Sequence, residues 1–416
     1  MRCQIRENSA QSLLFSENMR VISVILFITA LLVGCGRGKQ SSLEPGMHPV
    51  DTESPQVPAL TGGADRKGIS SAKEENQFSG FQIARGVAAD DTGNIYIADT
   101  GRNVIWKLNS RREISLFSGR VGFPGFSDGA RGVALFNNPV GLALGHNGVL
   151  YVGDCKNNAI RSIDANGAVK TIAGTATKEG YSDGVAEAAT FNCPNGVTVD
   201  KSNNLYIADS GNDLIREVSE SGGVSTLAGV PNSSARDCGD DNEGSSKCEG
   251  YQGIDGPNMS SSFNDPSDVF SSANGNIYVA DIGNGSIRKI SNGMVTTISR
   301  KNQSSAANKD GIGNGIMSPC GLLVDQSENV IFTDVIGETV SRISSSGDVS
   351  LFAGSRGETG SADGALGVAR FNGPCAIASN KNGDIYILER DGGELREISP
   401  SGSVSTISII GPAASN

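Results

Sequence analysis

Gly-Asn-Ile-Tyr-Ile-Ala-Asp at residues 93–99 is the first of six near-copies of one line in this chain. The other five copies lie at 148–154, 203–209, 275–281, 328–334 and 383–389. Recurrence at about fifty residues is the signature of one supersecondary unit repeated in an array. The architecture of the chain therefore follows from what a single unit contains.

The third copy shows the content of one unit. Four short runs rich in β-branched and aromatic residues follow one another, separated by Gly, Asn, Asp and Ser, at 194–200, 205–208, 214–218 and 224–227. Such runs predict strands joined by tight turns. Four strands make one antiparallel blade, and blades repeated around an axis make a propeller. We therefore predict an all-β, six-bladed β-propeller of four-stranded antiparallel blades over residues 78–410.

The first strands of the six units are expected to share one starting position. Five of the six starts are proline, which a strand tolerates as its first residue. The starts are Ala84, Pro139, Pro194, Pro266, Pro319 and Pro374. Each unit supplies four strands of its own, so the ring closes without exchanging a strand. The alternative is that residues just before Ala84 complete the last blade.

A second repeating element joins the units. In four linkers an Asp-Gly pair precedes a Phe-Asn pair, and in a fifth Asp310-Gly311 leads to Ile316 in the place of Phe. The Phe or Ile always lies three residues before the proline, and Phe81 holds the same place ahead of the first unit. Asp-Gly favours a tight turn, and the Ala-rich stretch after it predicts one helical turn. We expect the aromatic residue to fill the seam between neighbouring blades.

These motifs resemble the NHL-repeat family. The Pro-x-Gly-Val opening of residues 194–197, the Leu-Tyr-Ile-Ala-Asp strand of 205–209 and the Ile215-Arg216 step carry the resemblance, which covers roughly residues 80–410. The linkers resemble those of bacterial NHL proteins. The resemblance implies a propeller and a range of roles, among them protein-binding and RNA-binding modules, extracellular sensors and relatives of propeller lyases and lactonases.

The N-terminus has the pattern of an export signal. Residues 21–33 form an apolar run after Met19-Arg20, too short to span a bilayer comfortably. Leu32-Val33-Gly34-Cys35 resembles the bacterial lipobox, which implies that Cys35 is lipidated. We expect a signal peptide at 1–35, with Met19 as an alternative start, and a disordered tether at 36–77, because that composition cannot bury a core. A buried helix with an incidental cysteine is the alternative.

This N-terminal signal implies an exported protein that is lipid-anchored at a bacterial cell envelope, either at the outer membrane or on the cell surface. The formal net charge is −11, and it becomes about −12 when residues 1–34, with three basic and two acidic residues, are removed. An acidic domain lacks the positive surface that phosphate backbones need, so nucleic acid is not an expected partner. We expect a monomer.

Six of the eight cysteines belong to the expected exported part, beyond Cys3 and Cys35. An even number in an oxidising compartment favours disulfides. Position in the repeat predicts the inter-blade pairs Cys155–Cys193 and Cys320–Cys375, with free buried thiols as the alternative. Cys238 and Cys248 lie in one insertion, so we expect them to pair with each other.

The chain offers little for metal or imidazole chemistry. It has two histidines, His48 in the tether and His146 in the turn between the first two strands of the second unit. A metal site built from several histidines is therefore not expected. Oxygen ligands suffice for Ca²⁺, so a Ca²⁺-dependent lactonase or lyase-like enzyme is the second hypothesis. No catalytic or metal-binding residue is assigned, and no cofactor is expected.

The repeated strand ends in a carboxylate, at Asp99, Asp154, Asp209, Asp281, Asp334 and Glu389. A basic residue follows seven or eight positions later, at Lys107, Arg161, Arg216, Arg288, Arg342 and Arg396. Catalytic groups break symmetry and these obey it, so we interpret them as structural, with the carboxylate accepting backbone N–H groups and the basic side chain pairing across strands.

The places where the copies differ are the better candidates for a site. They are the insertion 231–250, the linker 300–316, Val335-Ile336, and Glu389 with Arg390-Asp391 after it. Loops on a rigid scaffold commonly carry binding residues, although drift in tolerant loops explains such differences equally well. The leading hypothesis is a binding scaffold for a protein, peptide or glycan.

Overall fold

The computed structural model describes residues 78, 80–176, 178–231, 253–300 and 316–411. The expected signal peptide and tether, Cys35, His48 and the Cys238–Cys248 pair lie outside these residues. Within the described part, the helices are single 3-10 turns, and none is long and apolar enough to cross a membrane. They are η1 (Cys155–Asn157), η2 (Ala186–Ala188), η3 (Ser210–Asn212), η4 (Asn258–Ser260) and η5 (Ile282–Asn284).

The first three blades follow the repeat. Blade one contains β1 (Ala84–Ala89), β2 (Ile95–Asp99), β3 (Val104–Leu108) and β4 (Ile114–Gly119). Blade two contains β5 (Pro139–Leu144), β6 (Leu150–Asp154), β7 (Ala159–Ile163) and β8 (Val169–Gly174). Blade three contains β10 (Pro194–Val199), β11 (Leu205–Asp209), β12 (Leu214–Val218), β13 (Gly223–Ala228) and the short β9 (Gly184–Val185).

The last three blades repeat the same order. Blade four contains β15 (Pro266–Ser271), β16 (Ile277–Asp281), β17 (Ser286–Ser291), β18 (Met294–Arg300) and the short β14 (Gly256–Pro257). Blade five contains β19 (Pro319–Val324), β20 (Val330–Asp334), β21 (Thr339–Ile343) and β22 (Val349–Gly354). Blade six contains β24 (Pro374–Ser379), β25 (Ile385–Glu389), β26 (Leu395–Ile398), β27 (Ser403–Thr406) and the short β23 (Gly364–Ala365).

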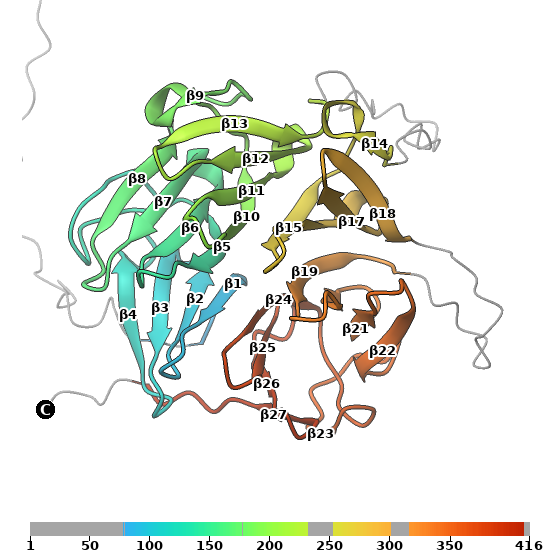
Figure 1. Cartoon of the computed structure of the whole chain (residues 1–416). Helices are drawn as coiled ribbons and strands as arrows, with labels where there is room; N and C mark the ends of the chain where they lie inside the picture. Colours follow the sequence, from blue (N-terminus) through green and yellow to red (C-terminus); the bar gives the residue numbers. More distant parts are fainter. Residues whose placement is uncertain (1–77, 79, 177, 232–252, 301–315, 412–416) are drawn as a thin grey trace, which may run out of the picture. The chain divides into compact units, whose positions relative to one another are not determined.

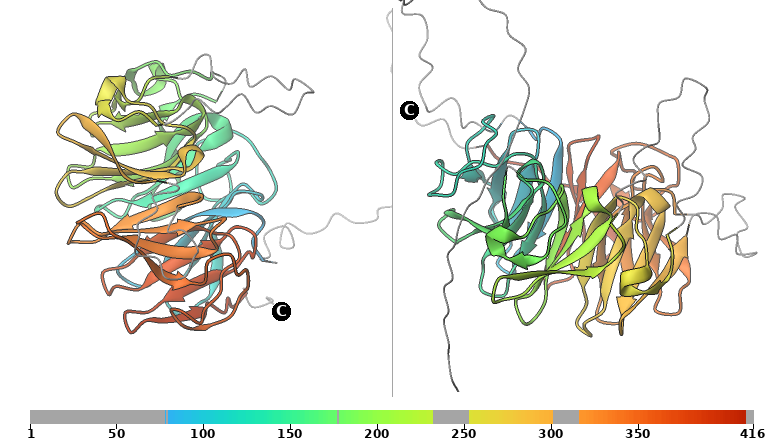
Figure 2. Two further views of the ribbon diagram at one scale, coloured as in Figure 1. Left: turned by 90° about the vertical axis from the view of Figure 1, so that its right-hand side faces the viewer. Right: turned by 90° about the horizontal axis from the view of Figure 1, so that it is seen from above.

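The six blades form a closed ring with the first strands at its centre (Figure 1). Each first strand packs against the next, in the order β1, β5, β10, β15, β19 and β24, and β24 packs against β1. The right-hand view of Figure 2 shows the ring from its side, and the strands there run roughly along the ring axis. No blade borrows a strand from the opposite end of the described chain. The predicted propeller, its six strand starts and its closure are therefore confirmed.

The hydrophobic core is divided among the six seams between blades. Phe136, Phe191, Phe263 and Phe371 are fully buried, and each lies in a cluster that combines residues of two neighbouring blades. Ile316 does the same between blades four and five, and Phe81 packs at the seam of blades one and six. The linker aromatic thus fills the seam, as its position in the sequence predicts.

The linkers contribute more than the predicted turn. β9, β14 and β23 each add a fifth, outermost strand to a blade through two paired residues. The prediction of four strands in every blade is therefore incomplete for blades three, four and six. On blade one, Ile410 near the C-terminus forms a parallel bridge to Glu113, and the Ile114 N–H donates to the Ile410 carbonyl at 3.0 Å. These additions cover part of the exposed outer sheet edges.

Candidate functional site

The repeated carboxylates lie at the ends of the second strands and are fully buried. Asp209 in blade three shows the arrangement. Its Oδ1 accepts the N–H of Asn192 at 2.8 Å, and its Oδ2 accepts Nη1 of Arg216 at 2.9 Å. The same contacts to Asn137 and Asn264 recur at Asp154 and Asp281. Each of these carboxylates therefore fastens the linker before its blade to the end of the second strand.

The buried arginine also holds the Asp-Gly turn of the linker. Arg216 Nη2 donates to Asp183 Oδ1 at 2.8 Å, and its guanidinium lies 5.0 Å from the Phe191 ring centre. The matching residues in blades two, four and six are Arg161 with Asp154 and Asp128, Arg288 with Asp281 and Asp255, and Arg396 with Glu389 and Asp363. These arginines join two carboxylates and a ring, which leaves the carboxylates engaged inside the blade.

Two basic residues do not occupy the position assigned to them from the sequence. Lys107 and Arg342 follow their carboxylates by eight residues, and in a strand one residue of offset points a side chain to the other face. The matching positions hold Trp106, whose Nε1 donates to Asp99 Oδ2 at 3.1 Å, and Ser341. Lys107 lies instead over the Tyr96 ring, 5.3 Å from its centre.

Blade five satisfies its carboxylate with backbone alone. Asp334 accepts the N–H groups of Met317, Ser318 and Gly337 at 2.8, 2.9 and 3.0 Å. A carboxylate that accepts several N–H groups needs no cation to remain buried.

Burial raises the pKa of the repeated carboxylates of blades one, two, three, four and six despite their partners. Burial is the largest influence on Asp154 and Asp209, whose pKa values rise to about 6, and on Glu389, whose pKa rises to about 7. Perturbed pKa values also occur in structural ion-pair networks, so they do not by themselves mark a catalytic site.

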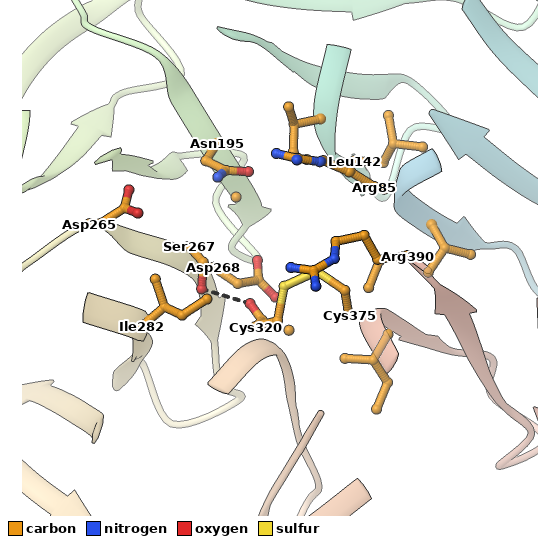
Figure 3. Close-up of a pocket in the computed structure, with 18 residues that line it drawn as sticks. Arg85, Leu142, Asn195, Asp265, Ser267, Asp268, Ile282, Cys320, Cys375 and Arg390 are labelled. Carbon is orange, nitrogen blue, oxygen red and sulfur yellow. Dashed lines mark hydrogen bonds between the residues drawn. A yellow bond between two sulfur atoms is a disulfide. The ribbon is translucent and has the colours of Figure 1, made fainter. Parts of the chain in front are cut away.

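Two of the three proposed cysteine pairs are disulfides in the structure. Cys155 is joined to Cys193 between blades two and three, and Cys320 is joined to Cys375 between blades five and six. The second bond links two first strands and lies beside the central channel (Figure 3).

A cavity of about 250 Å³ opens where the first strands begin and the second strands end. We call it the mouth cavity. The second residue of the first strand lines it in all six blades, and the residue after the second strand lines it in blades four and six. These positions contribute Arg85 from blade one, Asn195 from blade three, Ser267 and Ile282 from blade four, and Arg390 from blade six. Figure 3 shows both guanidinium groups on the inner side of the ring, with the Cys320–Cys375 bond beneath Arg390.

The waist of the channel carries one acidic side chain. The third residues of the six first strands are Gly86, Gly141, Gly196, Asp268, Gly321 and Ala376. A Cβ at Gly141 would lie 2.2 Å from the Asn195 carbonyl oxygen, and one at Gly321 would lie 2.4 Å from that of Cys375. Glycine is therefore required there, because the neighbouring strands approach so closely. Asp268 lines both the mouth cavity and a second cavity of about 260 Å³ toward the opposite face.

Asp268 is held by backbone donors. Its Oδ1 accepts the N–H of Val269 at 2.9 Å, and its Oδ2 accepts the N–H of Leu322 on the adjacent strand at 3.0 Å. Burial raises its pKa to about 7. At neutral pH this carboxyl is therefore divided between its neutral and ionised forms.

The waist of the channel offers few ligands for Ca²⁺. Ca²⁺ takes six to eight oxygen ligands, whereas the waist supplies one carboxylate among glycines and an alanine, and both of its oxygens already accept N–H groups. Within the described residues, no group of three or more His, Cys, Asp or Glu side chains is placed to hold a metal ion. His146 lies in the turn between β5 and β6, toward the opposite face.

Sequence reasoning found part of this site. It singled out Arg390 and Asp391 as a break in the repeat, and Arg390 lines the mouth. It missed Arg85 and Asp268. Comparison of the six first strands position by position reveals both residues. Arg85 and Asp268 are each charged, whereas the other five strands have small or uncharged residues at the same position.

Matches to family models agree with this architecture. The model of the teneurin NHL domain matches residues 181–291, and the model of the NHL repeat matches residues 81–108.

Curated relatives share part of the chain. NHL repeat-containing protein 2 of Homo sapiens is 28% identical over 271 residues, which cover 58% of this chain and 35% of that protein. Teneurin-4 of Homo sapiens is 34% identical over 151 residues, 34% of this chain and 5% of that protein. Protein SUPPRESSOR OF QUENCHING 1 of Arabidopsis thaliana is 29% identical over 152 residues, 34% of this chain and 14% of that protein. The chain thus spans about a third or less of each relative.

Solved structures share the fold. An auxiliary nutrient binding protein from Bacteroides thetaiotaomicron has a TM-score of 0.52 at 13% identity, covering 79% of this chain and 70% of that one. A streptogramin B lyase has a TM-score of 0.50 at 14% identity, covering 81% and 86%. Identity this low shows the fold alone. Together with the repeat matches, the six-bladed ring shows a β-propeller that is similar to NHL-repeat proteins.

Proposed function

We propose that this chain is an exported, membrane-anchored lipoprotein whose propeller binds a protein, peptide or glycan at the mouth cavity. The observation that carries the binding role is the concentration of unrepeated polar residues there. Arg85, Asn195, Ser267, Asp268 and Arg390 come from four blades and line one cavity, while the repeated carboxylates are engaged inside the blades.

The chemistry of the cavity supports binding rather than turnover. A few convergent polar groups on a rigid scaffold fix the orientation of a ligand. The described residues offer no metal cluster, and nucleic acid is disfavoured by the acidic charge of the chain.

The anchor part of the proposal rests on the sequence around Cys35. An apolar run followed by Leu-Val-Gly-Cys has the form of a lipoprotein signal, and two acyl chains hold a protein on a membrane where one chain is marginal. The 36–77 segment then acts as a tether for the propeller.

Arrays of peptides and glycans test the binding role. The full chain in detergent micelles is applied as wild type, as Asn195→Trp, which fills the mouth cavity, and as His146→Trp on the opposite face. We expect Asn195→Trp to lose at least tenfold in bound signal while it keeps the wild-type melting temperature, and His146→Trp to bind as wild type. Equal binding by Asn195→Trp, or no binding to either array, contradicts the proposal.

Cell fractionation with mass spectrometry tests the anchor. We expect wild type in the membrane fraction with the mass of a lipidated Cys35, and Cys35→Ala in the soluble exported fraction with no lipid mass. Unchanged membrane association and an unmodified wild-type cysteine would refute lipidation at this residue.

A further inference from the structure

The two cations of the mouth cavity are both exceptions to the repeat. The second residues of the other first strands are Val140, Asn195, Ser267, Cys320 and Cys375, whereas blade one has Arg85. The residues after the other second strands are Thr100, Cys155, Ser210, Ile282 and Val335, whereas blade six has Arg390. Both cations therefore lie at the seam where β24 meets β1.

The two guanidinium groups differ in how they are held. Arg390 is fixed by Asp391 through two contacts, Nε to Oδ1 and Nη2 to Oδ2, both at 2.8 Å. This pairing engages one edge of the guanidinium and orients the Nη1 group. Arg85 is exposed and interacts electrostatically with the carboxylate of Asp391, without the paired hydrogen bonds that fix Arg390. One guanidinium fixed by paired hydrogen bonds and one exposed guanidinium thus line the same cavity (Figure 3).

The remaining charges restrict the anion that fits. Asp391 lies beside Arg390, Asp265 lines the rim at blade four, and Asp268 closes the floor. A singly charged anion meets less repulsion from these carboxylates than a doubly charged phosphate does. Guanidinium groups bind planar carboxylates through paired N–H donors.

The size and lining of the cavity indicate what carries the carboxylate. About 250 Å³ lies below the range typical of sites for whole drug-sized molecules, so it accommodates a side chain or a chain end. Sugar rings are commonly held by stacking on aromatic side chains, and none is among the described residues that line the mouth. Capture of a terminal carboxylate is a recurrent mode of peptide recognition.

We propose that Arg85 and Arg390 bind a carboxylate of a peptide, at its C-terminus or on an acidic side chain, inserted into the mouth cavity. This inference rests on the proposed binding role and narrows its ligand class.

Retention of pooled tetrapeptides on the immobilised full chain tests it, with mass-spectrometric readout. One N-acetylated pool has free C-termini and no acidic side chains, a second is amidated and contains glutamate, and a third is amidated without acidic residues. We expect retention of the first or second pool, which identifies the source of the carboxylate, and no retention of the third. Arg85→Gln and Arg390→Gln should each weaken the retained pool at least about tenfold, since a charged hydrogen bond is lost.

Arg111→Gln is the matched control, because Arg111 is 80% exposed in the β3–β4 turn, away from the cavity. Equal retention of all pools, retention of none, or wild-type retention by Arg85→Gln overturns the inference. Retention of a phosphopeptide pool or of a glucuronate disaccharide in place of every carboxylate peptide also overturns it. If array binding is still blocked by Asn195→Trp in that case, the proposed function stands and the carboxylate assignment alone fails.

Discussion

The buried arginines of blades two, three, four and six each connect a blade to the linker that precedes it. Arg216 contacts Asp209 at the end of the second strand, Asp183 in the linker and the face of Phe191. A buried ion pair does not guarantee net stability, but removal of one partner leaves an uncompensated buried charge. Substitution of one of these arginines is therefore expected to lower the stability of the protein strongly.

Arg216→Met should lower the free energy of unfolding by about 3–5 kcal/mol, because Asp209 is left buried without its cation. Chemical denaturation measures this loss. Arg111→Met, on an exposed arginine, should change stability by less than about 0.5 kcal/mol. The double variant Asp209→Asn with Arg216→Met should cost less than the sum of its parts, and strict additivity would show that the pair is not coupled.

Asp268 should make stability depend on pH. Because its pKa rises from 3.8 to about 7 in the folded protein, the folded state keeps a proton that the unfolded state releases. Its contribution is fully present below about pH 4 and is lost as pH rises toward 7. Arg85, Arg390 and Asp265 line the same cavity, whereas the neighbouring first strands place Gly196 and Gly321 beside it.

Asp268→Asn should remove this dependence. Between pH 4.5 and pH 7.5, we expect the variant to gain about 3 kcal/mol relative to wild type, measured by denaturation at each pH. Glu187→Gln, at an exposed carboxyl, should follow the wild-type curve. A constant difference between Asp268→Asn and wild type at all pH values would show that Asp268 does not titrate in this range.

The elements of the ring are joined at their seams. Each linker aromatic lies between two blades, so its loss opens a cavity that neither blade fills alone. Phe191→Ala should destabilise the protein by about 3–5 kcal/mol, measured by denaturation. Val185→Ala in the same linker, at a side chain that is 71% exposed, should stay within about 0.5 kcal/mol. Similar costs for the two variants would contradict the seam-filling role.

At this scale the sequence predicts a great deal. The strand starts from Ala84 to Pro374 and the seam positions follow from a repeat that fixes strand spacing and register. The sequence does not predict the short strands β9, β14 and β23. Each has only two residues, such as Gly184 and Val185, and two residues are too few to show a strand pattern. Lys107 and Arg342 are misplaced because an offset of eight rather than seven changes the face of the strand.

In the molecule as a whole, the repeated residues form the scaffold and the unrepeated residues form the proposed site. The repeated carboxylates, aromatic residues and glycines hold blades to linkers and first strands to one another. The charged exceptions meet at one end of the channel, although Arg85 and Arg390 are some three hundred residues apart in sequence. Their proximity follows from closure of the ring. Comparison of the six repeats in the sequence therefore identifies each residue as an exception but does not show that the two line one cavity.

Photo-crosslinking in intact cells tests the location of the binding site most directly. A benzophenone amino acid is introduced into the full chain in place of Asn195 in the mouth cavity or of His146 on the opposite face, and adducts are resolved by mass after irradiation. We predict discrete adducts from position 195 and none from position 146. Adducts from position 146 alone, or from neither position, would contradict a binding site at the mouth cavity.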